Sequence, residues 1–257
     1  MRESHQEDPD VAPHILCVTA HPDDAEIALG GAISAWCHAG LRLTVAVCST
    51  SERSAAMSER RKNAAARAAR ILGHELTWVF PHDLRRVEDV TEHELVGRID
   101  GLVRESGADA VLAHADCDSH ADHRMVSRAV LASSRTWPDS ALLSFGVSEP
   151  RTAAYTRFQP SIFIPVAGHL ESKRAAIHEF HYDGKGYRDL DDDAMELRLR
   201  AMGSLCGVDA AEGLSLLRVV GQTRGARALA WLLRKVPDPS SDTANGVDSV
   251  RALDHRE

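Results

Sequence analysis

Two short stretches of the sequence concentrate histidine and aspartate side chains, AHPDDAE at residues 20–26 and HADH at residues 120–123. Their candidate metal-binding and catalytic residues are His21, Asp23, Asp24, His120, Asp122 and His123. Zinc in hydrolytic sites commonly binds three imidazole nitrogens or carboxylate oxygens and keeps one position for water. The ion lowers the pKa of that water to about 7, which makes it a nucleophile at neutral pH. The two stretches therefore predict metal-dependent hydrolysis if the fold brings them together.

Three of these side chains could bind the ion while two others act beside it. His21, Asp24 and His123 offer two nitrogens and one oxygen, a sufficient set for catalytic zinc. Asp23 could then accept a proton from water as a general base, and His120 could stabilise the charge developing on a carbonyl oxygen. Each stretch alone also has a structural interpretation, because aspartate is favoured at helix N-termini and HADH could be a solvated loop.

Strands and helices alternate along the first half of the chain, and this order predicts where the two stretches lie. The predicted strands cover residues 14–20, 41–49, 75–80 and 108–115, and the predicted helices cover residues 26–40, 58–73, 92–107 and 120–135. Such alternation implies right-handed crossovers and a mostly parallel sheet with helices on both faces. We expect a Rossmann-like α/β fold, a three-layer sandwich, in which both stretches follow the carboxyl ends of strands, where ligands bind. His114, near the end of the fourth strand, could contact a metal ligand from behind.

The pattern beyond residue 135 is less regular. Strands are expected at 161–165 and 214–220, and helices at 169–180, 193–207 and 225–236. Residues 1–12 and 236–257 are polar, so we expect a flexible N-terminus and a flexible tail around one α/β catalytic domain at 13–235. Gly30 and Gly31 lack the spacing of a phosphate-binding loop, and we expect close helix packing there.

Composition narrows the class of protein. The 257 residues include 38 acidic and 30 basic side chains, a formal charge of −8, which argues against nucleic-acid binding and favours a small-molecule or sugar partner. No apolar run approaches the roughly 20 residues that span a bilayer, and the opening residues do not resemble a secretory signal, so we expect a cytoplasmic protein without membrane contact. The five cysteines are scattered and never form a C-x-x-C pair, which predicts neither a disulfide framework nor a thiolate zinc site.

With AHPDDAE and HADH in this order and at this separation, the sequence resembles the PIG-L/LmbE-like zinc-dependent N-deacetylases. That family carries an A-H-P-D-D motif early in a Rossmann-like domain and an H-x-D-H motif after the fourth strand. The resemblance is best over residues 13–135, and ESKRAAI and AEGLSLLRVV extend it to about residue 220. It implies one zinc ion per chain, held by His21, Asp24 and His123. It also implies that Asp23 is the general base, His120 the oxyanion-stabilising acid and Asp122 the residue that orients a histidine.

The resemblance implies a reaction in which water attacks an acetamide carbonyl and releases acetate and a free amine. The expected substrate is an N-acetylated amino sugar or a small glycosylated metabolite, and the chain could form a homo-oligomer. The tentative substrate-binding residues are Arg53, Arg61, Asp83 and His181. Two positions depart from the family. Ser51 stands where T-x-G-E has glycine, and Asn63 or Ala64 replaces the glutamate of R-x-x-E.

Three alternatives remain open from the sequence. The first is an amidase that cleaves a larger acyl group or a thiol-conjugate amide. The second is a non-haem iron oxygenase, because two histidines and a carboxylate also form the facial triad, although the alternating strands and helices do not predict an all-β barrel. The third is a binding module without catalytic activity, which the failure to retain a divalent metal would indicate.

Overall fold

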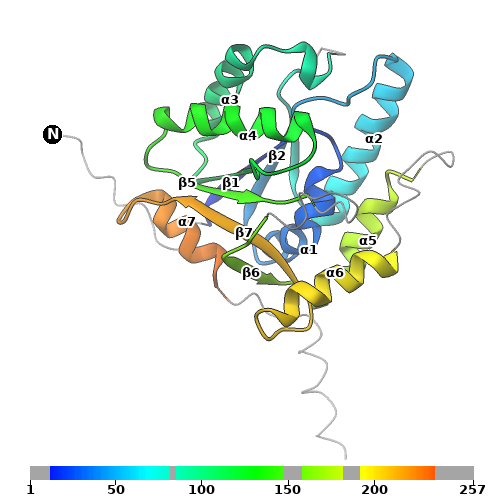
Figure 1. The fold of residues 1–257 in the computed structure, drawn as a ribbon, viewed down its shortest axis with the longest axis vertical. Helices are drawn as coiled ribbons and strands as arrows, with labels where there is room; N and C mark the ends of the chain where they lie inside the picture. Colours follow the sequence, from blue (N-terminus) through cyan, green and yellow to red (C-terminus); the bar gives the residue numbers. More distant parts are fainter. Residues whose placement is uncertain (1–11, 82–84, 148–157, 182–191, 235–257) are drawn as a thin grey trace, which may run out of the picture.

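The computed structural model describes residues 12–81, 85–147, 158–181 and 192–234, whose strands form one mixed sheet (Figure 1). The strands are β1 (His14–Thr19), β2 (Arg42–Val47), β3 (Glu75–Trp78), β4 (Ala110–His114), β5 (Ala141–Phe145), β6 (Ile162–Pro165) and β7 (Ala211–Arg218). Their order across the sheet is β3-β2-β1-β4-β5-β7-β6. The first five are mutually parallel, and β7 is antiparallel to both of its neighbours. The predicted mostly parallel α/β sheet is therefore confirmed.

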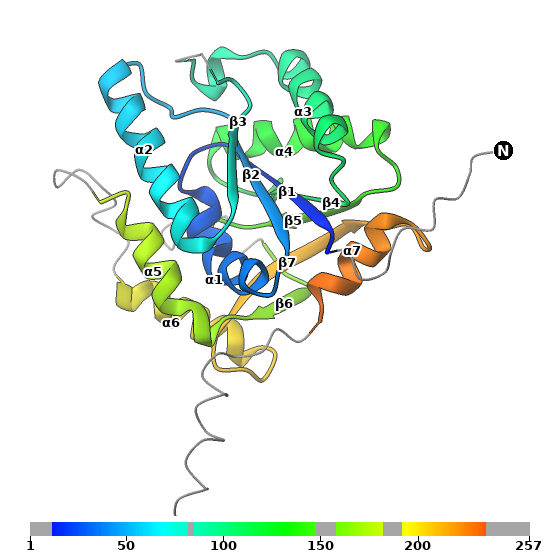
Figure 2. The ribbon, with the colours of Figure 1, turned by 180° about the vertical axis from the view of Figure 1, so that it is seen from behind.

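Helices cover both faces of this sheet. They are α1 (Asp24–His38), α2 (Ala55–Leu72), α3 (Glu92–Ser106), α4 (Ala121–Ser133), α5 (Leu170–His178), α6 (Asp192–Ser204) and α7 (Arg224–Leu232), with short 3-10 helices at Val87–Asp89, Ser134–Thr136 and Ala167–His169. Figures 1 and 2 show α3 and α4 on one side of the sheet and α1 and α7 on the other. Among the helices of the described ranges, none is both long enough and apolar enough to cross a membrane.

The alternation of side chains along the strands explains the two cores. In β1, Ile15 and Cys17 join the core beneath α1, α2 and α5 to α7, whereas Leu16 and Val18 join the core beneath α3 and α4. All six residues of β1 are buried, as expected for a strand covered on both faces. The three-layer arrangement follows from this two-sided burial.

The predicted helix ends at Gly73 and Gly107 are confirmed. Both glycines have a positive φ, +87° and +62°, and their N–H groups donate to carbonyls four residues earlier. Only glycine adopts this left-handed conformation without a steric cost, so the chain leaves α2 and α3 at these positions.

Close packing at Gly30 and Gly31 is also confirmed. A Cβ atom on Gly30 would lie 3.0 Å from Cγ of Lys173, and one on Gly31 would lie 2.8 Å from Cβ of Val166. Lys173 is fully buried, and its Nζ lies 2.6 Å from Oε1 of Glu212, which is 2% exposed. The same ammonium donates to two backbone carbonyls of α1, and Glu212 accepts two N–H groups of that helix. This buried ion pair joins α5 and β7 to α1.

The second half of the sheet differs from the sequence-based expectation. The pattern after residue 135 does not indicate β5, and β7 begins at Ala211 rather than at residue 214. The physical reason at β7 is Glu212, because a charged residue interrupts the apolar pattern while its carboxylate is in fact buried against Lys173. The flexible termini and the single domain at 13–235 stay predictions.

Candidate active site

The two motif stretches lie side by side at the carboxyl end of the sheet. AHPDDAE connects β1 to α1, and HADH lies at the start of α4, shortly after β4. Because β1 and β4 are neighbouring parallel strands, their following loops meet at one edge. Asp23 is the N-cap residue of α1, although its side chain makes no capping hydrogen bond, and His120 is the N-cap residue of α4, where its ring accepts the N–H group of Asp122.

Three predicted ligands converge at this edge. Nε2 of His123 lies 3.2 Å from Oδ1 of Asp24 and 3.4 Å from Nδ1 of His21, which lies 3.7 Å from Oδ2 of Asp24. All three residues are buried. Ligands about 2.0–2.1 Å from a tetrahedral zinc ion lie about 3.3–3.4 Å from one another. The two nitrogens and the carboxylate therefore fit such an ion in both chemistry and spacing.

Two more histidines lie in the same cluster. His120 groups with His21 and His123, and His114 groups with Asp24 and His123, each with its ligand atoms within 4.8 Å of one another. The cluster thus offers more candidate ligands than one ion requires. The protein contacts of each imidazole distinguish them.

The imidazoles of His21 and His123 each have one nitrogen beside a carboxylate. Nε2 of His21 lies 3.0 Å from Oδ2 of Asp122, the residue predicted to orient a histidine. Nδ1 of His123 lies 3.0 Å from Oδ2 of Asp118. In both rings the other nitrogen faces Asp24. Carboxylates behind imidazole ligands fix the ring orientation and increase the basicity of the ligand.

His114 and His120 instead receive backbone hydrogen bonds. The N–H group of Ala20 donates to Nε2 of His114 at 3.0 Å, and this same nitrogen lies 3.2 Å from Oδ2 of Asp24. The N–H group of Asp122 donates to Nδ1 of His120 at 3.2 Å. In neutral His120 the proton is therefore on Nε2, which is available as a donor. The expectation that His114 contacts a ligand from behind is confirmed.

The charges of the cluster favour a cation. Burial lowers the pKa of His21, but the carboxylates of Asp24 and Asp122 outweigh it and raise the pKa to about 9. Burial also lowers the pKa of His123, but Asp24 and Asp118 outweigh burial and raise this pKa to about 10. Burial raises the pKa of Asp24, but His123, His114 and His21 together outweigh burial and hold this pKa well below its usual range. Two cationic imidazoles beside a buried carboxylate resemble a site where a divalent ion displaces protons.

Asp23 has one engaged oxygen and one free oxygen. Arg61 donates to Oδ2 of Asp23 at 3.2 Å and to the carbonyl of Thr50 at 2.7 Å. Oδ1 of Asp23 is buried and has no hydrogen-bond partner among the residues that the structure describes. A buried carboxylate oxygen without a partner is costly, and a bound water or ligand would satisfy it.

The other tentative substrate-binding residues lie differently. Arg53 is exposed and pairs with Asp89 at 3.4 Å. The ring of His181 lies 5.1 Å from that of His178, and no described contact joins it to the cluster. Asp83 lies outside the described residues. Of the three candidates that the structure describes, Arg61 contacts the cluster, whereas Arg53 and His181 have no described contact with it.

The loop after β2 is strained at Ser51, where the family has glycine. Ser51 has a φ of +57°, in the left-handed region that favours glycine, and its Oγ is buried without a described partner. Its N–H group donates to Oγ of Ser49 at 2.9 Å. The loop therefore has the backbone conformation that favours glycine, although residue 51 is a serine.

Asp118 is the site residue for which the sequence assigned no role. It lies in the loop between β4 and α4, where its Oδ1 accepts the N–H group of His120 at 2.8 Å and its Oδ2 faces His123. Its contact with His123 depends on the turn between the two residues, which the sequence does not show. The only signal in the sequence was its position two residues before HADH.

Comparison with known proteins agrees with this geometry. Residues 16–134 match the family profile described as PIG-L, GlcNAc-PI de-N-acetylase. A search of curated protein sequences finds no match.

Solved structures share the fold. A conserved protein from Thermus thermophilus superimposes with a TM-score of 0.66 and 22% identity, over 81% of this chain and 96% of its own. N,N'-diacetylchitobiose deacetylase from Pyrococcus horikoshii superimposes with a TM-score of 0.64 and 20% identity, over 80% of this chain and 84% of its own. The 4-carboxy-2-hydroxymuconate hydratase from Pseudomonas putida superimposes with a TM-score of 0.58 and 20% identity, over 82% of this chain and 99% of its own. Since one fold serves a deacetylase and a hydratase, the reaction has to be inferred from the site.

Proposed function

We propose, from the membership of residues 16–134 in the PIG-L family, that this chain is a zinc-dependent hydrolase that deacetylates a small N-acetylated amino sugar or glycosylated metabolite. One observation carries the proposal. Nδ1 of His21, Nε2 of His123 and the two carboxylate oxygens of Asp24 lie 3.2–3.7 Å apart, and the N-cap residue Asp23 next to them has a buried Oδ1 without a partner among the described residues. A metal site and a general base are thereby next to each other in the chain.

His21, Asp24 and His123 would hold the ion, one per chain, because Nε2 of His114 and Nδ1 of His120 already accept backbone hydrogen bonds. Bound there, zinc would lower the pKa of water and polarise the amide carbonyl. Asp122 and Asp118 keep the two ligand imidazoles oriented through their second nitrogens.

Asp23 moves the proton in this proposal. Its free Oδ1 accepts a proton from the attacking water, whose oxygen bonds to the carbonyl carbon. The C–N bond then breaks, and the proton passes to the leaving nitrogen, which yields a carboxylate and an amine. Arg61 holds the other oxygen of Asp23 and so fixes the direction of the base.

His120 stabilises the developing charge on the carbonyl oxygen. Its Nδ1 accepts the N–H group of Asp122, so the neutral ring presents its Nε2 proton as a donor. Burial, together with repulsion from His21 and His123, lowers the pKa of His120 and favours this neutral form. The residue is exposed, in keeping with contact to a substrate.

The test combines metal analysis of the purified protein with amine release from a panel of N-acetylated sugars, with and without a chelator. About one zinc ion per chain and chelator-sensitive release are the expected results. Asp23→Asn should keep the metal and lower kcat by about 10²–10⁴-fold or more. Asp116→Asn, an exposed aspartate of the β4–α4 loop, is the matched control. Full activity in Asp23→Asn would refute the role of the base, and absence of metal would refute the zinc site.

A further inference from the structure

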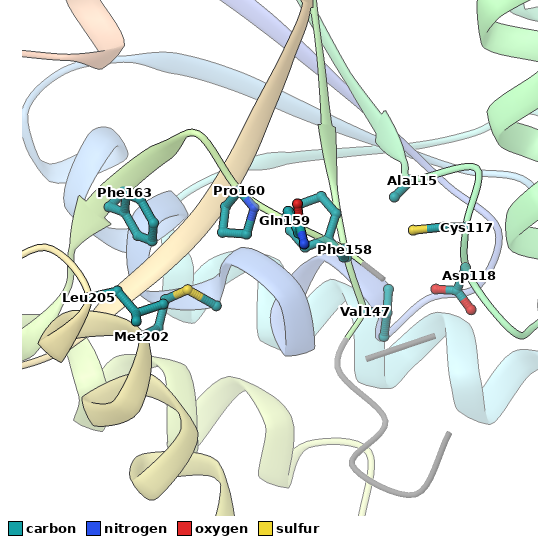
Figure 3. A pocket seen from close by; sticks show the side chains of 11 residues that line it. Ala115, Cys117, Asp118, Val147, Phe158, Gln159, Pro160, Phe163, Met202 and Leu205 are labelled. Atoms are coloured by element: carbon teal, nitrogen blue, oxygen red, sulfur yellow. The ribbon is translucent and has the colours of Figure 1, made fainter. Parts of the chain in front are cut away.

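An open cavity of about 300 Å³ lies beside the β4–α4 loop at Asp118 and is lined at its other end by Phe163, Met202 and Leu205 (Figure 3). Figure 3 shows Cys117 and Asp118 at one side of this cavity, and Phe163, Met202 and Leu205 at the other. The aromatic ring of Phe158 lies between the two groups. Asp118 is the charged residue among its lining side chains, which are otherwise mostly apolar. The cavity therefore extends from the β4–α4 loop to β6 and α6 along apolar groups.

Asp118 makes the connection between this cavity and the candidate active site. The residue lines the cavity, while its Oδ2 lies 3.0 Å from Nδ1 of His123. Asp118 therefore lies between the cavity and the ring of His123, and a substrate whose amide lies at the predicted ligands would have to extend past this side chain to reach the cavity. The wall is closely packed, because a Cβ on Gly146 would lie 2.7 Å from Cδ1 of Phe158.

We propose that the substrate carries an apolar chain, several carbons longer than an acetyl methyl, and that this chain binds in the cavity. The inference rests on the proposed hydrolysis and specifies its substrate class. An acetyl methyl alone fills only a small part of such a volume, and pockets of this size and apolar lining bind apolar ligand groups. The chain is either the acyl group of the amide or an alkyl or aryl group on the sugar.

Two substrate series distinguish these sources. The first is glucosamine N-acylated with acetyl, butanoyl, hexanoyl or octanoyl groups, and the second is a set of alkyl glycosides of N-acetylglucosamine with the same chain lengths. In the series that uses the cavity, kcat/KM should rise by up to about fourfold for each methylene until the cavity is filled. A rise in the first series identifies an acyl chain and a rise in the second an aglycone. No rise in either series overturns the proposal.

Variants on one helix and its end test the location of the chain. Leu205 lines the cavity directly after α6 and is 72% exposed, so Leu205→Glu should fold and place a charge at the apolar end. It should lower the ratio of kcat/KM for the longest chain to that for acetyl by at least tenfold. Met202→Glu, deeper in the cavity, should act more strongly. Leu197→Glu, on α6 and 69% exposed outside the lining, should keep the wild-type ratio. Equal ratios in all variants would overturn the assignment.

A binding measurement separates this inference from the proposed function. Calorimetric titration with N-octanoylglucosamine and N-acetylglucosamine measures affinity without turnover. Tighter binding of the octanoyl compound that Leu205→Glu abolishes supports the cavity even if no amide is hydrolysed. Hydrolysis of acetamides with equal affinity for both compounds keeps the proposed function and overturns the cavity inference.

Discussion

At the scale of single residues, the two ring nitrogens of His21, and likewise those of His123, face different carboxylates in the candidate site. In His21 and His123 one nitrogen faces a carboxylate of α4 or its preceding loop, and the other faces Asp24. Asp118 and Asp122 therefore contact the two imidazoles although neither residue is a predicted ligand. Such carboxylates determine ring orientation and the affinity for metal.

Asp118→Asn tests the contact of Asp118 with His123. The amide oxygen can still accept the N–H group of His120, so the start of α4 should be preserved, whereas the negative charge beside His123 is lost. We expect zinc affinity, measured by competition with a chromogenic chelator, to fall by about 10–100-fold. Asp116→Asn should leave the affinity unchanged. Equal affinities in both variants would mean that Asp118 only caps the helix.

The sequence predicts those site residues that lie close together along the chain, and it does not predict contacts that depend on a turn or on helix packing. His21, Asp23 and Asp24 are contiguous with one strand end, and His120, Asp122 and His123 share one helix start, so motif and topology bring them together. The contact between Asp118 and His123 depends on the turn between them, and that of Arg61 with Asp23 depends on how α2 packs beside α1. Neither contact leaves a periodic signal in the chain.

At the scale of elements, the loop between β2 and α2 stores strain at Ser51. Its φ of +57° is costly for a residue with a Cβ, and its hydroxyl is buried without a described partner. Ser51→Gly should raise the free energy of unfolding by about 0.5–1 kcal/mol, since relief of strain exceeds the added freedom of the unfolded chain. Ser51→Ala removes the hydroxyl but keeps the Cβ, and should gain less. Urea unfolding of the three proteins measures the difference, and an equal gain in both variants would assign the cost to the hydroxyl.

The Lys173–Glu212 pair holds three elements together from inside the fold. Lys173→Met leaves the carboxylate of Glu212 buried without its cation, which should lower the free energy of unfolding by about 3–5 kcal/mol. Lys173→Met combined with Glu212→Leu removes both charges and should recover part of the loss. Thermal and urea unfolding give the comparison. The single variant Glu212→Leu completes the comparison. If the double variant lost as much free energy of unfolding as the two single variants lose together, or more, this account would be wrong.

This pair also shows why the second half of the sheet is harder to predict. The parallel strands β1 and β4 are buried along their whole length and consist mostly of apolar residues, so composition alone indicates them. In β7 the buried Glu212 breaks the run, and its direction depends on a partner strand, not on its own residues. The strand β5 is five residues long and follows the 3-10 helix Ser134–Thr136, which leaves only a short apolar segment as a signal.

At the scale of the whole molecule, the candidate metal site lies between the two helical layers that cover the sheet. Its ligands come from the β1–α1 connection and from α4, which packs beneath the opposite face from α1. A metal ion bound there holds both layers against the sheet edge, so unfolding of either layer would release the ion. Metal binding should therefore stabilise the entire fold and not one loop.

The size of this stabilisation is a test of that coupling. An ion at a free concentration 100 times its Kd adds about 2.7 kcal/mol to the free energy of unfolding, provided that the unfolded chain does not bind it. For a protein of this length that corresponds to a rise in Tm of about 5–10 °C. Addition of zinc to chelator-treated protein should produce this rise, and Asp24→Asn should not show it. Asp116→Asn should retain it, because an exposed loop carboxylate does not bind the ion. A zinc-dependent rise of equal size in Asp24→Asn would show that the ion binds elsewhere, and the ligand set drawn from both layers would have to be abandoned.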